Sequence, residues 1–153
     1  VVSARCAWGS AMASTSVSRG SVGVESRVPR GSTTICEFVD GPDAEPWRLF
    51  LEVGPPSNLF NPRFPSHGGL VQGRTRYDAY STNEMDPAPL GMRAPMITGT
   101  VFWTEGRAVA AVERLLPGRI VMACSLPAAE ESLFVAVGTA LLVFDLESGA
   151  FPR

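Results

Sequence analysis

The stretch Ile97–Ser125, ITGTVFWTEGRAVAAVERLLPGRIVMACS, contains three short apolar runs separated by turn-forming residues. The first run, Ile97–Thr104, ends at Glu105-Gly106, and the last, Arg119–Ser125, follows Pro117-Gly118. Short runs that are rich in β-branched and aromatic residues and bounded by Gly or Pro are typical of strands. The stretch therefore predicts an antiparallel β-meander.

The middle run of this stretch has two interpretations. As a strand it covers Ala108–Val112 and continues the meander. The longer segment Arg107–Leu116 is made of strong helix formers, however, and Pro117-Gly118 would stop a helix there. The fold class is therefore mainly β, either propeller-like or a small sandwich, with an α+β fold containing one helix near residues 107–116 as the alternative.

Further strands are predicted on both sides of the meander. Thr33–Val39 is rich in β-branched and aromatic residues, and Trp47–Val53 alternates with a period of two residues. Downstream, Leu133–Val137 and Leu141–Leu146 flank the turn-like residues Gly138–Ala140, which predicts a hairpin.

The faces of that hairpin follow from the alternation of side chains along a strand. Leu133 and Val135 are expected on one face, and Phe134 and Phe144 on the other. Because both faces are apolar, we expect the hairpin to lie in the centre of a sheet or to be covered on both sides.

Residues 1–34 differ in composition from the rest of the chain. They hold eight serines, four arginines and one acid, Glu25, so they carry a charge of +3 while the remainder of the chain carries −5. A Ser-rich, Arg-bearing, acid-poor segment is typical of an organellar transit peptide or of a low-complexity tail. Such a segment cannot build a core, so we expect an extended arm with little regular structure that is ordered by contact with other chains.

The segment from Gly54 to Pro95 is predicted to be an irregular insertion in the strand-rich domain that covers residues 35–153. It contains seven prolines and many Gly, Asn and Ser residues, which oppose long regular elements. Long irregular connections in compact domains usually have a function or bind a partner.

Two stretches resemble blades of the kelch type of β-propeller. Val143–Phe151 (VFDLESGAF) matches the progression from an aromatic residue and Asp through a Ser-Gly turn to a bulky residue, and Tyr77–Met85 is a looser copy. The resemblance implies propeller-like sheet structure and a role in protein recognition. The double glycine of kelch blades is absent, and Asp78 and Asp145 are 67 positions apart, which is longer than the kelch period of roughly 50.

Several enzyme classes are excluded by residue types that the chain lacks. All 13 basic side chains are Arg, so neither a Schiff base nor a phosphate-binding loop with its Lys can form. His67 is the one histidine and no G-x-S-x-G motif accompanies it, so a hydrolase that uses His67 is a distant alternative. We expect no catalytic residues, no cofactor and no metal site.

The three cysteines are Cys6, Cys36 and Cys124, and no C-x-x-C motif occurs. Their odd number and wide spacing predict no disulfide framework, and a reducing or organellar compartment is expected. Cys36 and Cys124 fall in predicted strands, where a thiol is usually a small buried hydrophobic group.

Partner binding is assigned to aromatic and Arg side chains of the irregular segment. Such residues are enriched at interface hot spots, and Arg can bind a partner's carboxylate through two hydrogen bonds. Arg74, Arg76, Tyr77 and Tyr80 could also stack on single-stranded bases, but a turn that packs its tyrosines on the core and exposes its arginines is favoured over that role. The expected contact residues are Phe60, Arg63, Phe64, Arg74, Arg76, Tyr77, Tyr80 and Arg93.

Together these features predict a non-catalytic accessory or structural subunit of a larger protein assembly in a chloroplast or mitochondrion. Its partners are expected to be other protein subunits, without direct contact to nucleic acid, because the net charge of −2 gives no drive toward phosphate. The longest apolar run is shorter than a membrane-spanning helix requires, although the chain could lie at the periphery of a membrane complex. The alternative is a propeller-like recognition fragment.

Overall fold

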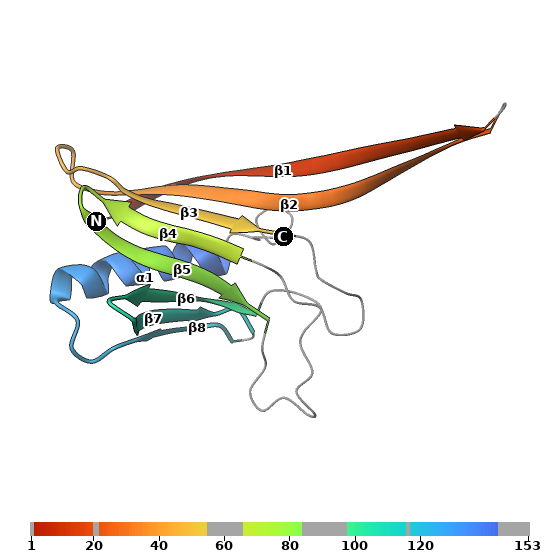
Figure 1. The fold of residues 1–153 in the computed structure, drawn as a ribbon. Helices are drawn as coiled ribbons and strands as arrows, with labels where there is room; N and C mark the ends of the chain where they lie inside the picture. Colours follow the sequence, from red (N-terminus) through yellow and green to blue (C-terminus); the bar gives the residue numbers. More distant parts are fainter. Residues whose placement is uncertain (1, 20–21, 55–65, 84–97, 116, 144–153) are drawn as a thin grey trace, which may run out of the picture.

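The computed structural model describes residues 2–19, 22–54, 66–83, 98–115 and 117–143, and for residues 8, 10–19 and 22–30 it describes the backbone alone. This part of the chain forms eight strands and one helix (Figure 1). The elements are β1 (Val2–Arg19), β2 (Val22–Asp40), β3 (Trp47–Val53), β4 (Ser66–Gln72), β5 (Thr75–Thr82), β6 (Gly99–Thr104), β7 (Arg107–Glu113), β8 (Arg119–Met122) and α1 (Ala128–Val143).

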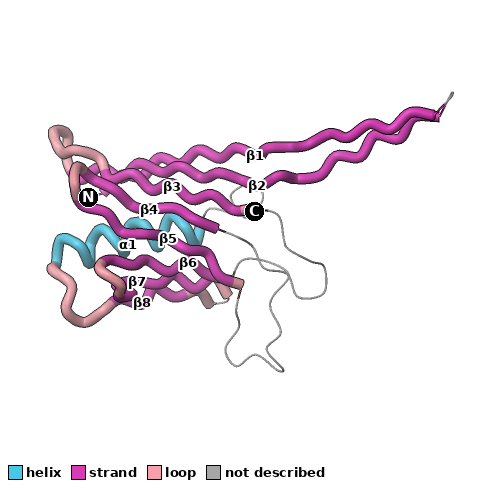
Figure 2. The backbone as a smooth tube through the Cα atoms, viewed as in Figure 1, coloured by secondary structure: helices cyan, strands magenta, loops and turns pink. Residues whose placement is uncertain are grey.

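The strands form one antiparallel sheet in which each strand pairs with its neighbour in the sequence, from β1 to β8. The sheet curls into a half-barrel, and α1 lies on one side of it (Figures 1 and 2). The mainly β prediction is thus confirmed. Residues 107–113 form β7, so the helix that was the alternative for residues 107–116 does not exist, and the helix of this fold lies farther along the chain.

The predicted C-terminal hairpin is wrong, because residues 128–143 form the helix α1. Pro127 precedes the helix and its carbonyl accepts the Glu131 N–H at 3.0 Å. The buried residues recur at helical spacing, since Leu133, Phe134, Val137 and Leu141 face the sheet, whereas Val135 is exposed. Leu133 and Val135 therefore do not share a face, which corrects the expected alternation.

The core lies between the concave face of the sheet and α1. Phe38, Leu49, Leu70 and Phe102 come from the sheet, and Phe134 enters from the helix. The helix contacts β1 and β2 on one side and β7 and β8 on the other, so it bridges the two open edges of the half-barrel. A helix that lies in the concave side of the sheet fills the space that a ligand would occupy in an open barrel.

The insertion predicted between Gly54 and Pro95 is wrong over part of its length. Ser66–Gln72 and Thr75–Thr82 form the hairpin β4–β5, which lies in the middle of the sheet, and Gly73 takes a positive φ of 55° in its turn. The remaining parts, residues 55–65 and 84–97, lie outside the described residues, as do residues 144–151 of the kelch-like stretch. The kelch resemblance therefore stays a prediction.

The first two strands extend well beyond the rest of the sheet. β2 pairs with β3 only from Ser32 to Phe38, whereas its pairing with β1 continues from Ala11↔Gly31 to Arg19↔Val22. Figures 1 and 2 show this two-stranded ribbon running away from the body. We call residues 11–19 and 22–31 the arm. The expectation of little regular structure in residues 1–34 was wrong, although the arm is extended.

The arm leaves the body at a glycine. Gly31 has a φ of +137°, which side chains rarely allow, and a Cβ there would lie 2.5 Å from the Val53 carbonyl oxygen. The register between β1 and β2 shifts at the same place, between Ala11 and Met12. Such an irregularity bends a ribbon and increases its twist, so this site sets the direction of the arm.

A disulfide joins the two strands at the base of the arm. Cys6 and Cys36 are directly opposite each other in the β1–β2 register and are bonded to each other. The expectation that the cysteines form no disulfide is therefore wrong for this pair. Cys124 is free and exposed, which also corrects its expected burial.

Candidate binding surfaces

The residues predicted to bind a partner fall into two groups. Phe60, Arg63, Phe64 and Arg93 lie outside the described residues. The other four are on the β4–β5 hairpin: Arg74 in the turn, and Arg76, Tyr77 and Tyr80 on β5.

Tyr77 is not available to a partner in this structure. Its side chain is in the core, with 3% of its surface exposed, and its hydroxyl donates a hydrogen bond to Glu130 Oε2 at 2.6 Å. Its ring lies 5.8 Å from that of Trp47 and 5.1 Å from that of Phe134. Burial and the neighbouring Glu130 carboxylate raise the pKa of Tyr77 far above its usual value. Tyr77 therefore joins β5 to α1, whereas Tyr80 is exposed.

The convex face of the sheet carries an exposed apolar surface. The strand register places Ile35 opposite Phe50 and Tyr80 opposite Val101, and both pairs are on this face. Tyr80, Ile35 and Val121 are 47%, 49% and 50% exposed, and Trp103 is 38% exposed. We call the following residues the outer patch: Ile35, Phe50, Tyr80, Val101, Trp103 and Val121.

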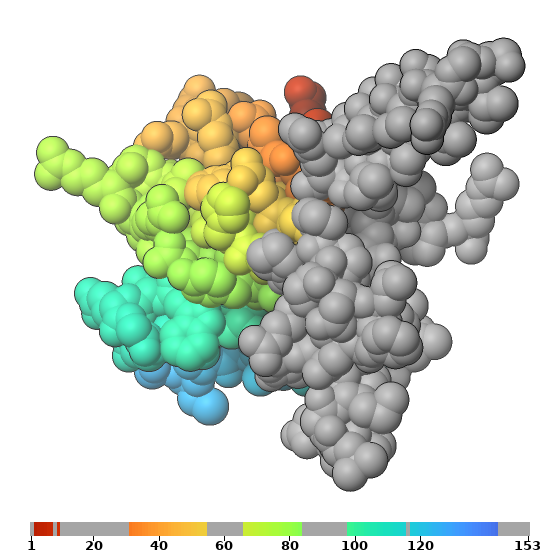
Figure 3. All heavy atoms as spheres, turned by 45° about the vertical axis from the view of Figure 1, so that its right-hand side comes forward, coloured from red at the N-terminus to blue at the C-terminus, as the bar shows by residue number. Residues whose placement is uncertain are grey.

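Paired charges interrupt the outer patch. Asp78 is directly opposite Trp103 in the register, and its Oδ1 lies 2.8 Å from Arg76 Nε. The Arg76 guanidinium lies 5.7 Å from the centre of the Phe50 ring, and His67 Nε2 lies 2.7 Å from Glu52 Oε2. Exposed pairs of this kind contribute little to stability. Figure 3 shows part of this face, with β2 to β7 following one another from orange to teal.

The backbone register of the arm pairs its two strands residue by residue. Ala13 is opposite Val28, Val17 is opposite Val24 and Arg19 is opposite Val22. The pairs between them include Ser14↔Arg27 and Ser16↔Glu25.

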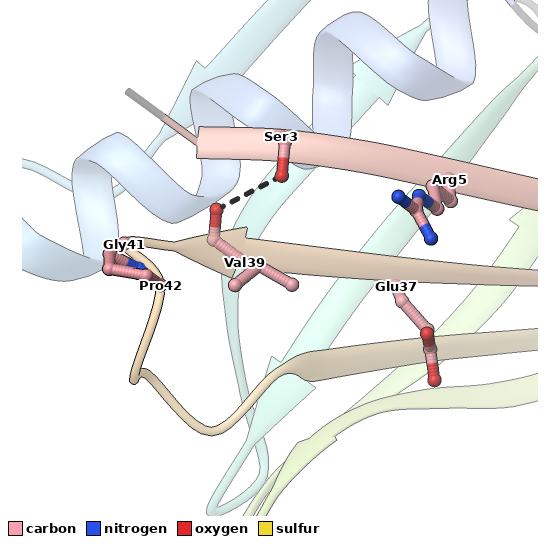
Figure 4. Close-up of a pocket in the computed structure, with 6 residues that line it drawn as sticks. All are labelled: Ser3, Arg5, Glu37, Val39, Gly41 and Pro42. Atoms are coloured by element: carbon pink, nitrogen blue, oxygen red, sulfur yellow. Dashed lines mark hydrogen bonds between the residues drawn. The ribbon is translucent and has the colours of Figure 1, made fainter.

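Two hollows lie at the base of the β1–β2 ribbon. The first, of about 440 Å³, is an open depression beside Ser3, Arg5 and Glu37 (Figure 4). The Ser3 hydroxyl donates a hydrogen bond to the Val39 carbonyl at 3.5 Å (Figure 4). The second hollow, of about 250 Å³, has Trp47 among its lining residues. His67 lines neither of the two.

Catalytic and metal chemistry find little support in the part of the chain that the structure describes. Nucleophilic catalysis requires a nucleophile within hydrogen-bonding reach of a base, and His67 is instead paired with Glu52 on the convex face. Among the described residues, no three His, Cys, Asp or Glu side chains lie close enough to hold a metal ion. The helix in this part of the chain is too short to cross a membrane.

Comparison with known proteins finds no family model, no curated protein and no solved structure that matches this chain. Its function is therefore inferred from its geometry.

Proposed function

We propose that this protein is a non-catalytic subunit of a protein assembly and that the arm is its docking element. The observation that carries the proposal is the β1–β2 ribbon, which continues past the last β2–β3 pair, Ser32↔Val53, as far as Arg19↔Val22. An extension of this kind is not needed to form the core of the body.

The low stability expected of an isolated two-stranded ribbon supports the binding of a partner. A two-stranded hairpin in water is marginally stable at best, because it has no third strand and no packed face. Among the described residues, no third strand pairs with the arm, and α1 lies beside the body of the sheet (Figure 1). A partner that covers one face of the arm would supply the apolar burial that an isolated ribbon lacks.

The organellar origin that the Ser- and Arg-rich segment indicates remains part of the proposal. The Cys6–Cys36 disulfide adds a condition to it, because structural disulfides persist in oxidising compartments. A compartment of that kind within an organelle would be compatible with both features.

The decisive experiment removes the arm and leaves the body. In the armless variant, residues 12–30 are replaced by Asn-Gly, which makes a two-residue hairpin loop between Ala11 and Gly31. We expect the body to keep its cooperative thermal unfolding, while the native assembly in the cells that make the protein loses this subunit on native gels. The proposal fails if the folded armless chain enters the assembly as well as the full chain does.

A position-specific control tests whether the arm is the element that docks. A photo-crosslinking amino acid at Val17, in the arm, should form adducts with another chain, whereas the same group at Val135, an exposed position on α1, should form few. Equal yields at both positions would contradict docking through the arm.

A further inference from the structure

The first strand of the sheet is attached to the body less firmly than its neighbour. β2 has a partner strand on each side, and its buried side chains include Thr34, Cys36 and Phe38. β1 is an edge strand that pairs with β2 alone, and none of its described side chains is buried (Figure 1). Val2 and Cys6, which pack against the core, are half-buried. Core packing therefore holds β2 on the body but does little to hold β1.

The Cys6–Cys36 disulfide supplies a firmer attachment. It joins residues that are directly opposite each other in the β1–β2 register, and Cys36 is 1% exposed. The bond thus ties the edge strand to a residue that is fixed in the core. Backbone pairs at an edge open locally more easily than pairs in the centre of a sheet, and a covalent link between the two strands limits how far such an opening can spread.

The more accessible end of this bond is on the edge strand. Cys6 is half-buried whereas Cys36 is enclosed, so a thiolate reaches the bond at Cys6. Its attack forms a mixed disulfide with Cys6 and releases Cys36 as a thiolate, which takes up a proton. The second thiol of a dithiol then displaces Cys6. The protein gains two electrons and two protons as two thiols, and the dithiol becomes a disulfide.

We propose that the Cys6–Cys36 disulfide is a redox-sensitive cross-link: when a dithiol reduces it, β1 opens away from β2 while β2 to β8 and α1 remain folded. The body does not depend on β1 for its core, because the buried apolar side chains of the described residues come from β2 and later elements. Reduction therefore acts on one strand and not on the whole fold.

The consequence for docking rests on the proposed function. The arm is a ribbon made of β1 and β2, so opening of β1 dismantles the element that would dock. Reduction would release this subunit from its assembly, and oxidation would allow it to return.

Amide hydrogen exchange of the purified full chain, read by mass spectrometry, tests the cross-link. Dithiothreitol should speed exchange in peptides that cover residues 2–9 by roughly a hundredfold, because β1 can then open locally. Exchange in β3 and α1 should stay within about twofold of the oxidised chain. The strand at the other edge of the sheet, β8, contains no cysteine and is the internal control. Replacing the reductant with oxidised glutathione should restore slow exchange in β1.

A substitution separates the bond from other effects of the reductant. Cys6→Ala breaks the cross-link at its more exposed end and keeps the Cys36 sulfur in the core, so residues 2–9 should exchange as in the reduced wild type, with or without dithiothreitol. Cys124→Ala removes the free thiol and should behave as wild type. The reduced wild type carries no substitution, so it gives the result even where Cys6→Ala does not fold.

Three outcomes would overturn the inference. They are a disulfide that stays intact in dithiothreitol under native conditions, a fully reduced chain in which residues 2–9 still exchange slowly, and a reduced chain in which all elements exchange rapidly together. A reduced chain whose β1 opens but which keeps its place in the native assembly would refute the link to docking alone. An armless chain that enters the assembly would refute the proposed function and leave the cross-link standing.

Discussion

Tyr77 on β5 donates its hydroxyl hydrogen to Glu130 on α1 at 2.6 Å, and this bond links the middle of the sheet to the first turn of the helix across 53 positions of sequence. The ring of Tyr77 also packs against Trp47 and Phe134. One residue thus joins the two layers by both packing and a hydrogen bond to a carboxylate.

Removing the Tyr77 hydroxyl should weaken the contact between these layers. Tyr77→Phe keeps the ring and leaves Glu130 without this donor, so we expect the free energy of unfolding to fall by about 1–2 kcal/mol. Urea denaturation followed by circular dichroism measures the change. Tyr80→Phe is the matched control, because Tyr80 is exposed, and it should stay within about 0.5 kcal/mol of wild type.

The raised pKa of Tyr77 predicts a loss of stability at high pH. Because the pKa is higher in the folded state than in the unfolded state, the folded chain holds more protons between the two values and its stability falls as pH rises above about 10. Below that pH the contribution is fully present. The stability of Tyr77→Phe should depend less on pH between 9 and about 11. Equal pH dependence in both proteins would contradict the assignment.

Phe134 is the main contribution of α1 to the core. It is 1% exposed and its ring packs against those of Tyr77 and Phe102. Phe134→Ala should lower the free energy of unfolding by about 3–5 kcal/mol, because it leaves a cavity in a site that cannot collapse fully. Val135→Ala, at an exposed position of the same helix turn, should change it by about 0.5 kcal/mol or less.

Gly68 is required by the close approach of β3 and β4. A Cβ at this position would overlap the Phe50 carbonyl oxygen and lie 2.9 Å from the Leu51 Cα, both of which are backbone atoms that cannot rotate away. Gly68→Ala should therefore cost at least about 2 kcal/mol. Gly9→Ala is a suitable control, since a Cβ there meets nothing within 4 Å. Comparable melting temperatures for the two variants would show that the strands can separate without cost.

The Cys6–Cys36 disulfide should stabilise the folded chain by reducing the conformational entropy of the unfolded chain. The two cysteines are 30 positions apart, and closing a loop of that length is worth about 3.6 kcal/mol in the chain-entropy account. The double variant Cys6→Ala/Cys36→Ala should lose about that amount, and dithiothreitol should have the same effect on wild type but none on the variant. Cys124→Ala, which removes the free thiol, is the control.

Local patterns predicted β3, β6, β7, β8 and part of β2 as strands, and missed β1, β4 and β5. Trp47–Val53 is a strand with the bounds that its alternation indicated, because Leu49, Leu51 and Val53 face the core and Arg48 and Glu52 face water. In a half-buried strand, the alternation of apolar and polar residues indicates which side faces the core and which faces water.

Local patterns failed for α1 because the helix is apolar on nearly all sides. Val135 and Val143 are exposed although they are aliphatic, so no polar stripe marked the helical period, and Gly138 suggested a turn. A glycine is favoured at position 138 of the helix because Ile120 packs closely against it: a Cβ there would lie 2.6 Å from Ile120 Cδ1. Glu130 and Glu131 in the first turn, after Pro127, were the signal of a helix start.

The candidate surfaces could be predicted only in part. Tyr80 and Arg76 are on the exposed face as proposed contacts should be, whereas Tyr77, on the same strand, is in the core. The outer patch combines residues from β2 to β8. The pattern within one strand does not show which residue of another strand is opposite it.

Because Gly31 has no side chain, its backbone can pass close to Val53, and its conformation sets the position of the distant tip of the arm. Any larger residue would have to move away from the Val53 carbonyl, and the whole ribbon beyond it would turn with the backbone. With roughly 30 Å of ribbon beyond this point, a rotation of only about 10° displaces the tip by about 5 Å, which is one full strand spacing. A small change in the backbone at Gly31 would therefore move the tip of the arm much farther than it moves the backbone at Gly31 itself.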